Sequence, residues 1–147
     1  MMEHHVTPGD SGVRDASILI VEDDHGAVEA FEHMLKAEGY DVRVTLDAES
    51  ALVEIERAVP AAVLLDLHLP IANGLEFLRR LRATSRHTHI PVAVVTGDYL
   101  VDERVARELQ ALGAQLYLKP LWEEDLIRIV RDLLLPARRY ATPWNIP

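Results

Sequence analysis

A continuous apolar run meets three acidic residues in the stretch Ile18-Leu19-Ile20-Val21-Glu22-Asp23-Asp24. Four consecutive branched apolar residues are typical of a strand that is buried on both faces of a parallel sheet. The acidic residues then stand at the carboxyl end of that strand, which is the edge where open α/β sheets bind their ligands. The stretch therefore predicts a fold class and also the edge of the sheet at which a site would lie.

Four further short runs continue the pattern along the chain. They are Val42-Arg43-Val44, Ala61-Ala62-Val63-Leu64-Leu65, Val92-Ala93-Val94-Val95 and Gln115-Leu116-Tyr117-Leu118. The first of them is short and alternates with a charged residue, which favours an edge strand.

Helical stripes separate these runs, because apolar residues recur there every three or four positions. The stripes are Val28, Phe31 and Leu35; Ala48, Leu52, Ile55 and Val59; Leu75, Leu78 and Leu81; Val101, Val105, Leu109 and Leu112; and Leu126, Ile129, Val130 and Leu133. Asp47 is predicted to cap the N-terminus of the second helix, and Gly39 and Gly113 are predicted to follow helix C-termini. Five strand–helix repeats predict an α/β fold whose parallel sheet carries helices on both faces.

The length of 147 residues predicts one domain. The regular pattern covers residues 17–135, and we expect a flexible N-terminal tail at 1–16 and an irregular C-terminal tail, containing Trp144, at 136–147. No cysteine is present, which excludes disulfides, thiolate metal sites and a thiol nucleophile. A net charge of −9 argues against a nucleic-acid partner. The chain has no apolar run long enough for a membrane span and no signal-peptide pattern, so we expect a cytoplasmic protein without a membrane partner.

The residues that end the strands carry the chemistry of this sequence. The first strand ends in Glu22-Asp23-Asp24, the third in Asp66, the fourth in Thr96 and the fifth in Lys119. A parallel sheet brings these ends to one edge, where clustered carboxylates repel one another unless a cation offsets their charge. Oxygen ligands of this kind suit Mg²⁺ or Mn²⁺. A carboxylate beside such a metal can attack a phosphoryl group and form an acyl phosphate.

Each of these features also has an ordinary structural explanation. An acidic run after a strand often caps a helix, a single aspartate often belongs to a turn, and Thr96-Gly97 and Lys119-Pro120 are common dipeptides. The four features occur together, on successive strands and in order, which favours a functional site centred on Asp66.

The sequence resembles the receiver domain of two-component response regulators. The matching segments are Ile18–Asp24, Leu64-Leu65-Asp66-Leu67-His68-Leu69-Pro70, Asn73-Gly74, Val94-Val95-Thr96-Gly97 and Tyr117-Leu118-Lys119-Pro120. The resemblance covers residues 17–135 and implies a flavodoxin-like fold with strand order 2-1-3-4-5. It also implies a cis bond between Lys119 and Pro120 and a tight backbone turn permitted by Gly74.

The family's site residues carry over position by position. Asp66 is expected to accept a phosphoryl group from a phosphohistidine of a sensor histidine kinase or a phosphotransfer protein. Asp23, Asp66 and the backbone carbonyl of His68 are expected to ligate Mg²⁺, with Glu22 acting through water. Thr96 and Lys119 are expected to bind the phosphoryl oxygens.

The resemblance also implies a switch. Thr96 is expected to move toward the phosphoryl group while Tyr117, at the position of the family's switch aromatic, turns inward to fill the space. The surface formed by the fourth helix, the fifth strand and the fifth helix would then change shape and bind a downstream protein, or a second copy of the chain.

The side chains of three histidines and one aspartate need separate interpretation. The side chain of His68 is expected near the mouth of the site, where it would control the access of water or contact a partner. Asp98 is placed where it would pair with a protonated His68. His87 and His89 have a spacing compatible with a metal, but a solvated loop is the favoured interpretation.

The sequence thus predicts a stand-alone receiver that switches protein contacts or relays a phosphoryl group. It is not expected to be an enzyme beyond its own phosphorylation and dephosphorylation at Asp66. A scaffold that keeps the fold without the chemistry is the main alternative. An aspartyl-phosphate phosphatase would need a second aspartate where His68 stands, and a flavin-binding module would need a phosphate loop in place of Glu22-Asp23-Asp24.

Overall fold

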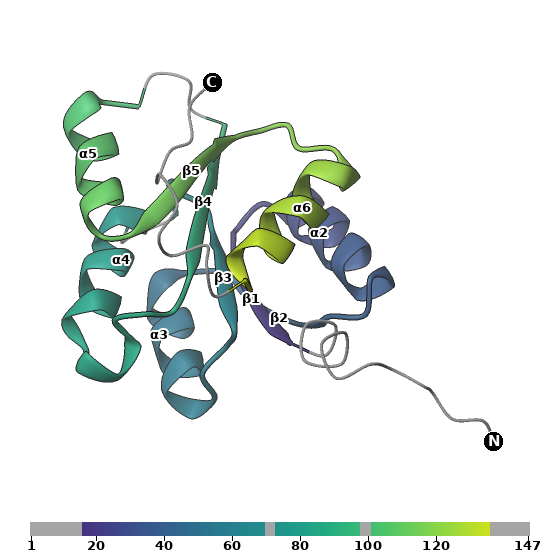
Figure 1. The fold of residues 1–147 in the computed structure, drawn as a ribbon, viewed down its shortest axis with the longest axis horizontal. Helices are drawn as coiled ribbons and strands as arrows, with labels where there is room; N and C mark the ends of the chain where they lie inside the picture. The colour runs from purple at the N-terminus through teal and green to yellow at the C-terminus, as the bar shows by residue number, and fades with distance from the viewer. Residues whose placement is uncertain (1–15, 70–72, 98–100, 136–147) are drawn as a thin grey trace.

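A five-stranded parallel sheet forms the centre of the molecule in the computed structural model, which describes residues 16–69, 73–97 and 101–135 (Figure 1). The strands are β1 (Ser17–Val21), β2 (Asp41–Thr45), β3 (Ala62–Leu65), β4 (Val92–Thr96) and β5 (Ala114–Leu118). Their order is β2-β1-β3-β4-β5 and every neighbouring pair is parallel. This confirms the predicted fold class and strand order.

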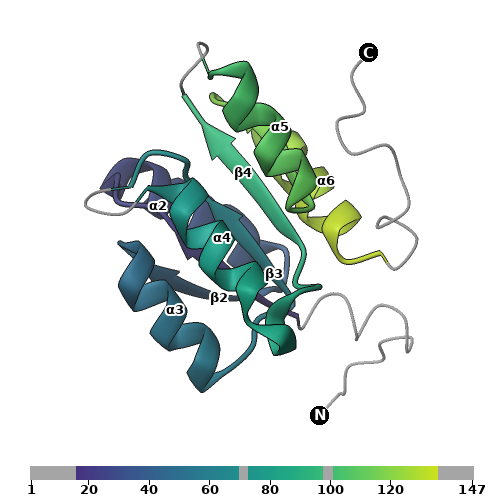
Figure 2. The ribbon, with the colours of Figure 1, turned by 90° about the vertical axis from the view of Figure 1, so that its left-hand side faces the viewer.

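Helices cover both faces of this sheet. They are α2 (His25–Ala37), α3 (Ala48–Arg57), α4 (Gly74–Ala83), α5 (Glu103–Ala111) and α6 (Glu123–Leu133), with a short 3₁₀ helix η1 (Ser85–His87) after α4. Figure 2 shows α3, α4 and α5 on the near side of the sheet and α2 and α6 behind it. None of the described helices is long and apolar enough to cross a membrane.

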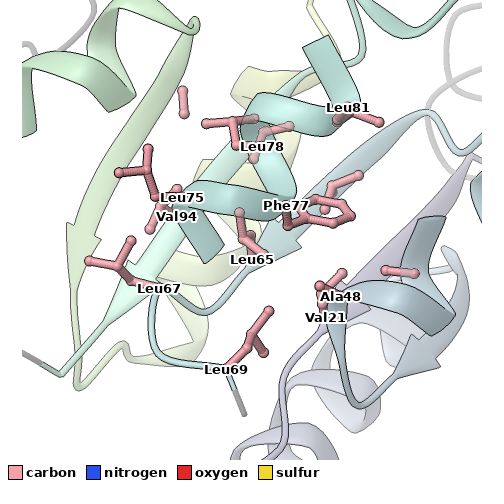
Figure 3. Packing of buried hydrophobic residues seen from close by; sticks show 14 of the residues in the cluster. Val21, Ala48, Leu65, Leu67, Leu69, Leu75, Phe77, Leu78, Leu81 and Val94 are labelled. Atoms are coloured by element: carbon pink, nitrogen blue, oxygen red, sulfur yellow. The ribbon is translucent and has the colours of Figure 1, made fainter. Parts of the chain in front are cut away.

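Two apolar cores result, one on each face of the sheet. Alternate residues of the buried strands point to opposite faces: Leu19 and Val21 contact the core beneath α3, α4 and α5, whereas Ile18 and Ile20 contact the core beneath α2 and α6. Figure 3 shows part of the first core, with α4 side chains packed over β3 and β4. β2 is an edge strand as predicted, since it pairs only with β1 within the described sheet.

The helix ends follow the predicted pattern at three positions. Asp47 caps α3 by accepting a hydrogen bond of 2.8 Å from the Ser50 amide. Gly39 and Gly113 follow α2 and α5 with φ angles of 103° and 79°, a region that glycine adopts readily.

Two sequence predictions in this part of the fold are wrong. Val59 was expected in the stripe of the second helix, but α3 ends at Arg57 and Val59 is 57% exposed. His87 was expected in a solvated loop, but its side chain is only 3% exposed within η1, with Nδ1 3.8 Å from a carboxylate oxygen of Glu56. His89, by contrast, is exposed as expected.

Two arginine side chains form hydrogen bonds to several elements at once, which hydrophobic periodicity does not reveal. The guanidinium of Arg82 on α4 donates to three backbone carbonyls, those of Leu112 (2.8 Å), His87 (3.2 Å) and Ile90 (2.7 Å). Arg43 on β2 similarly bonds Ser17, Glu54 and the carbonyl of Ala58. Each guanidinium thus joins elements that are distant in sequence.

Candidate functional site

The ends of β1, β3, β4 and β5 lie at one edge of the sheet, which we call the carboxyl edge. Asp66 directly follows β3, the central strand, and its amide donates to the carbonyl of Val21 at the end of β1. Lys119 follows β5, and its amide donates to the carbonyl of Thr96 at 2.8 Å. These backbone bonds continue the ladders of the sheet, so the positions of the predicted site residues follow from strand pairing.

Glu22, Asp23 and Asp66 form an acidic cluster at this edge. Carboxylate oxygens of the three residues all lie within 4.8 Å of one another. Glu22 and Asp66 are buried, with 3% and 8% exposure, whereas Asp23 is exposed. The cluster therefore has two charges held away from water and one at its mouth, a set of oxygen donors that fits a hard divalent cation.

Lys119 supplies the cation that the structure itself places in the cluster. Its Nζ lies 2.8 Å from Oε1 of Glu22, while the other carboxylate oxygen of Glu22 accepts from the Asp24 amide at 3.2 Å. Glu22, which was predicted to act through water, is thus the ion-pair partner of Lys119. The peptide bond between Lys119 and Pro120 is cis, as the resemblance implied.

Asp66 has an altered affinity for protons. Burial raises the pKa of its carboxyl group to about 6, and the negative charge of Glu22 adds to this effect. The positive charge of Lys119 and a hydrogen bond from the His68 amide to Oδ1, at 3.2 Å, act in the opposite direction but do not cancel it. Two carboxylates share this pocket with one ammonium, so the cluster can accept further positive charge.

Asp24 illustrates how one acidic run serves two purposes. Its Oδ2 accepts from the Ala27 amide at 2.9 Å and caps α2, as the ordinary explanation of the acidic run anticipates. Glu22 and Asp23 instead belong to the acidic cluster. The same three residues therefore end a strand, begin a helix and form part of the site.

The turn after Asp66 brings two backbone segments unusually close. A Cβ atom at Gly74 would lie 2.6 Å from the carbonyl oxygen of Asp66 and 2.9 Å from the Cα of Leu67. The sequence predicted a tight turn here, and the structure locates the constraint in this close approach of α4 to the segment that carries Asp66. Asn73 caps α4 by accepting from the Glu76 amide at 2.9 Å.

Thr96 and Tyr117 do not lie on the same face of the sheet. Along β4, Val94 belongs to the core beneath α5 and Val95 to the core beneath α6, so alternation directs Thr96 to the α5 face. Tyr117 packs against the core beneath α6, and its hydroxyl donates to Oε1 of Gln115 at 2.7 Å. Tyr117 therefore lies on the opposite face of the sheet from the one to which alternation directs Thr96, and the predicted movement of the two side chains stays a prediction.

For several predicted site residues the structure gives little or no information about the predicted role. The side chain of His68 is exposed, and its predicted role near the mouth of the site stays a prediction. Pro70, Asp98 and Trp144 lie outside the described residues, as do 1–15 of the N-terminal tail and the whole C-terminal tail. The predicted pairing of His68 with Asp98 therefore stays a prediction.

Comparison with known proteins gives a consistent family. Residues 18–131 match the family model of the response regulator receiver domain. The transcriptional regulatory protein PrrA of Mycobacterium leprae (strain TN) is 35% identical over 134 residues, which are 90% of this chain and 55% of that protein. This chain spans about half the length of the curated relatives it matches.

Solved structures agree with this assignment. The chemotaxis response regulator CheY4 of Vibrio cholerae matches with a TM-score of 0.74 and 26% identity over 82% of this chain and 99% of its own. The receiver domain of the sensor histidine kinase PA1611 from Pseudomonas aeruginosa PAO1 matches with a TM-score of 0.73 and 29% identity over 82% of this chain and 98% of its own. That structure is described as having a magnesium ion coordinated in the active site cleft.

Proposed function

The chain belongs to the family of response regulator receiver domains, and from this premise we propose that Asp66 accepts a phosphoryl group from a phosphohistidine. The observation that carries the proposal is the position of Asp66: it is buried at the end of the central strand, within 4.8 Å of two further carboxylates and beside the Lys119–Glu22 pair. A buried carboxylate among like charges is held at a cost in stability, which is typical of a functional group.

The transfer itself needs few protein groups. A carboxylate oxygen of Asp66 attacks phosphorus, a phosphorus–oxygen bond forms, and the phosphorus–nitrogen bond of the donor breaks. The electron pair of the broken bond returns to the departing imidazole. Asp66 must be ionised for the attack, and the charge of Lys119 favours that form. Thr96 and Lys119 are proposed to hold the phosphoryl oxygens, in keeping with the hydroxyl and ammonium groups that they offer.

We propose that Glu22, Asp23 and Asp66, with the backbone carbonyl of His68, provide the site for Mg²⁺ or Mn²⁺. The fit rests on the chemistry of the donors, which are carboxylate oxygens within 4.8 Å of one another and accompanied by a single ammonium group. A divalent cation here would neutralise negative charge on the transferring group. The Lys119–Glu22 pair meanwhile keeps the ammonium at the edge of the same cluster.

The test is the intact mass of the protein after incubation with acetyl phosphate, with and without Mg²⁺. We expect one phosphoryl adduct on the wild type with Mg²⁺ and none on the Asp66→Asn variant. Asp24→Asn is the matched control, because Asp24 lies in the same loop but caps a helix, and asparagine also caps. An adduct on Asp66→Asn would show that another residue accepts the phosphoryl group. No adduct on the wild type with Mg²⁺ present, and no binding of Mg²⁺, would favour the alternative of a scaffold without phosphoryl chemistry.

The partners follow from the same premise. We propose a sensor histidine kinase or a phosphotransfer protein as the donor, and a surface of α5, β5 and α6 as the region that binds the downstream protein or a second copy of the chain. Support for this surface comes from apolar side chains that remain exposed on it, Leu118 at 44% and Trp122 at 69%. A cytoplasmic location and the absence of enzymatic activity beyond Asp66 remain predictions of the sequence.

A further inference from the structure

A cavity lies on the α2 face of the sheet, behind the two buried residues of the acidic cluster. Glu22 and Asp66 line this cavity together with apolar residues of the strands and of α2. Glu22 follows Ile20 of β1 by two positions, so alternation directs both side chains to the same face. Asp66 follows Leu64 of β3 in the same way. Ile20 and Leu64 belong to the core beneath α2 and α6, so the cavity has an apolar floor under its two carboxyl groups.

Phe31 is the contribution of a helix to this lining. Among the described residues around the cavity, the others belong to β1, β3 and β4 or directly follow β1 and β3, whereas Phe31 belongs to α2. Its side chain is only 6% exposed and lies in the core beneath α2 and α6. Asp24 caps α2 by accepting a hydrogen bond from the Ala27 amide, so the helix begins directly after the residues of the cluster. Phe31 thus forms the helix side of the cavity.

An apolar wall behind two carboxylates strengthens their attraction for a cation. Charges interact more strongly in apolar surroundings than in water, and the apolar shell around a metal site controls how far solvent enters it. Water admitted to this cavity would find the carboxyl groups of Glu22 and Asp66 as hydrogen-bond partners, which is the condition under which cavities hold water. The solvated carboxylates would then attract a cation less strongly.

We propose that Phe31 is a positioning residue of the acidic cluster, whose ring keeps water out of the cavity behind Glu22 and Asp66 and so strengthens the binding of a divalent cation. Phe31 acts through the two carboxylates and is not itself a ligand of the cation. The proposal deepens the proposed function and rests on it for the cation. The exclusion of water rests on the lining of the cavity alone.

The first test is the dissociation constant of the full chain for Mg²⁺, measured by isothermal titration calorimetry. We expect Phe31→Ala to weaken the binding about tenfold, because the space left by the ring admits water behind the carboxylates. Phe31→Leu keeps an apolar group in that space and should stay within about twofold of the wild type.

Leu35→Ala is the matched control for the loss of an apolar side chain from α2. Leu35 is the other buried residue of this helix, one turn beyond Phe31 and in the same core, but it is not among the described residues that line the cavity. Both alanine substitutions truncate a large core side chain, so both should lower the stability of the fold. Leu35→Ala should nevertheless leave the dissociation constant for Mg²⁺ within about twofold of the wild type. Equal weakening in both variants, or unchanged binding in Phe31→Ala, would overturn the proposal.

The second test detects water in the cavity with a chelator present and no metal ion added. We expect nuclear Overhauser effects between water and the methyl groups of Ile20 and Leu64 in Phe31→Ala, and none in the wild type or in Leu35→Ala. Water beside these methyl groups in the wild type, or its absence from them in Phe31→Ala, would contradict the exclusion of water by the ring.

The two tests separate a failure of this proposal from a failure of the proposed function. If the wild type binds no Mg²⁺, the proposed metal site fails, and the Overhauser effects still decide whether Phe31 excludes water. If the wild type and Phe31→Ala bind Mg²⁺ equally, the metal site stands and the role of Phe31 fails. Phe31→Val removes less of the side chain and gives the same comparison if Phe31→Ala does not fold.

Discussion

Within the single residue Asp66, the burial of the carboxyl group opposes the ionised form that its proposed chemistry requires. The fold buries its carboxyl group beside Glu22, which disfavours the charged form, while phosphoryl acceptance needs that form. The pKa of Asp66, raised to about 6 by burial and by the charge of Glu22, reflects this conflict. Burial also keeps water away from the Asp66 carboxylate, which would protect the acyl phosphate that we propose it forms.

Removing the charge at Asp66 should stabilise the protein when a chelator is present. A carboxyl group whose folded pKa lies above its ordinary value of 3.8 disfavours the folded state once it ionises. This cost is absent below about pH 4, develops through the interval up to about 6, and is complete above it. We therefore expect Asp66→Asn to be about 1–2 kcal/mol more stable than the wild type at pH 7 and equally stable at pH 4. Urea unfolding with EDTA at both pH values measures this difference, and a constant difference between them would contradict the explanation.

The close approach of the backbone at Gly74 leads to a second prediction about a single residue. Any Cβ there meets backbone atoms of Asp66 and Leu67, which cannot move without shifting the site. We expect Gly74→Ala to lower the free energy of unfolding by about 1–3 kcal/mol and to slow adduct formation at Asp66. Gly26→Ala is the control, because the nearest atom to its Cβ is 3.7 Å away and the position is helical. It should be neutral or slightly stabilising, and an equal loss in both variants would show that the close contact is not the cause.

At the scale of helices and strands, hydrogen bonds from partly buried arginine side chains connect elements that apolar packing alone would leave less firmly joined. Arg82 connects α4 to the C-terminal end of α5 and to the segment before β4 through three carbonyls, and burial lowers its pKa to about 10. The buried leucines of α4, which are Leu75, Leu78 and Leu81, pack into the apolar core on this face of the sheet, as Figure 3 shows. Apolar packing thus sets which face α4 buries, and the guanidinium sets how its C-terminal end meets two other elements.

Substitution of Arg82 should accordingly be far more costly than that of its neighbour. Arg82→Met keeps the aliphatic stem but leaves three carbonyls without this donor, and we expect a loss of about 2–4 kcal/mol in the free energy of unfolding. Arg80→Met removes one exposed ion pair to Glu49 and should cost less than about 1 kcal/mol. Chemical denaturation of both variants makes the comparison. Similar losses would mean that the carbonyl contacts of Arg82 contribute little.

The whole molecule gathers its reactive groups at one edge because all five strands run in the same direction. Four of the five strand ends contribute side chains to that edge, and Asp23 is exposed there. The chain carries a net charge of −9, and the acidic cluster adds local repulsion to this overall excess. A divalent cation bound at the cluster would reduce both the local repulsion and the net negative charge.

Mg²⁺ should therefore stabilise the entire fold. A ligand that binds only the folded protein adds about 2.7 kcal/mol at a free concentration one hundred times its dissociation constant. We expect the midpoint of thermal unfolding to rise with Mg²⁺ in the wild type and to respond much less in Asp23→Asn, which removes one donor at the mouth of the cluster. Asp47→Asn, a helix-cap substitution away from the cluster, serves as the control and should respond like the wild type. An equal response in Asp23→Asn would exclude this cluster as the metal site.

The sequence alone was sufficient to predict the sheet, its helices on both faces, the edge strand and the cluster of Glu22, Asp23 and Asp66 with Lys119. These properties depend on the period of apolar residues and on the residue that ends each strand, and both are local features of the chain. The strand order came from the family resemblance. Two local expectations still failed, since Val59 lies beyond the end of α3 and His87 is buried.

Only the tertiary structure decided the remaining features. Which face of the sheet Tyr117 occupies depends on the register of β5 against β4, and that register is set by backbone pairing between segments that are distant in sequence. The partners of Arg79, Arg82 and Lys119 depend likewise on where other elements lie. A charged side chain carries no periodic signal for its partner, because long and flexible side chains can reach many groups until packing selects one. The sequence thus determined the layers and the chemistry, and packing in three dimensions determined which contacts connect the site to the rest of the molecule.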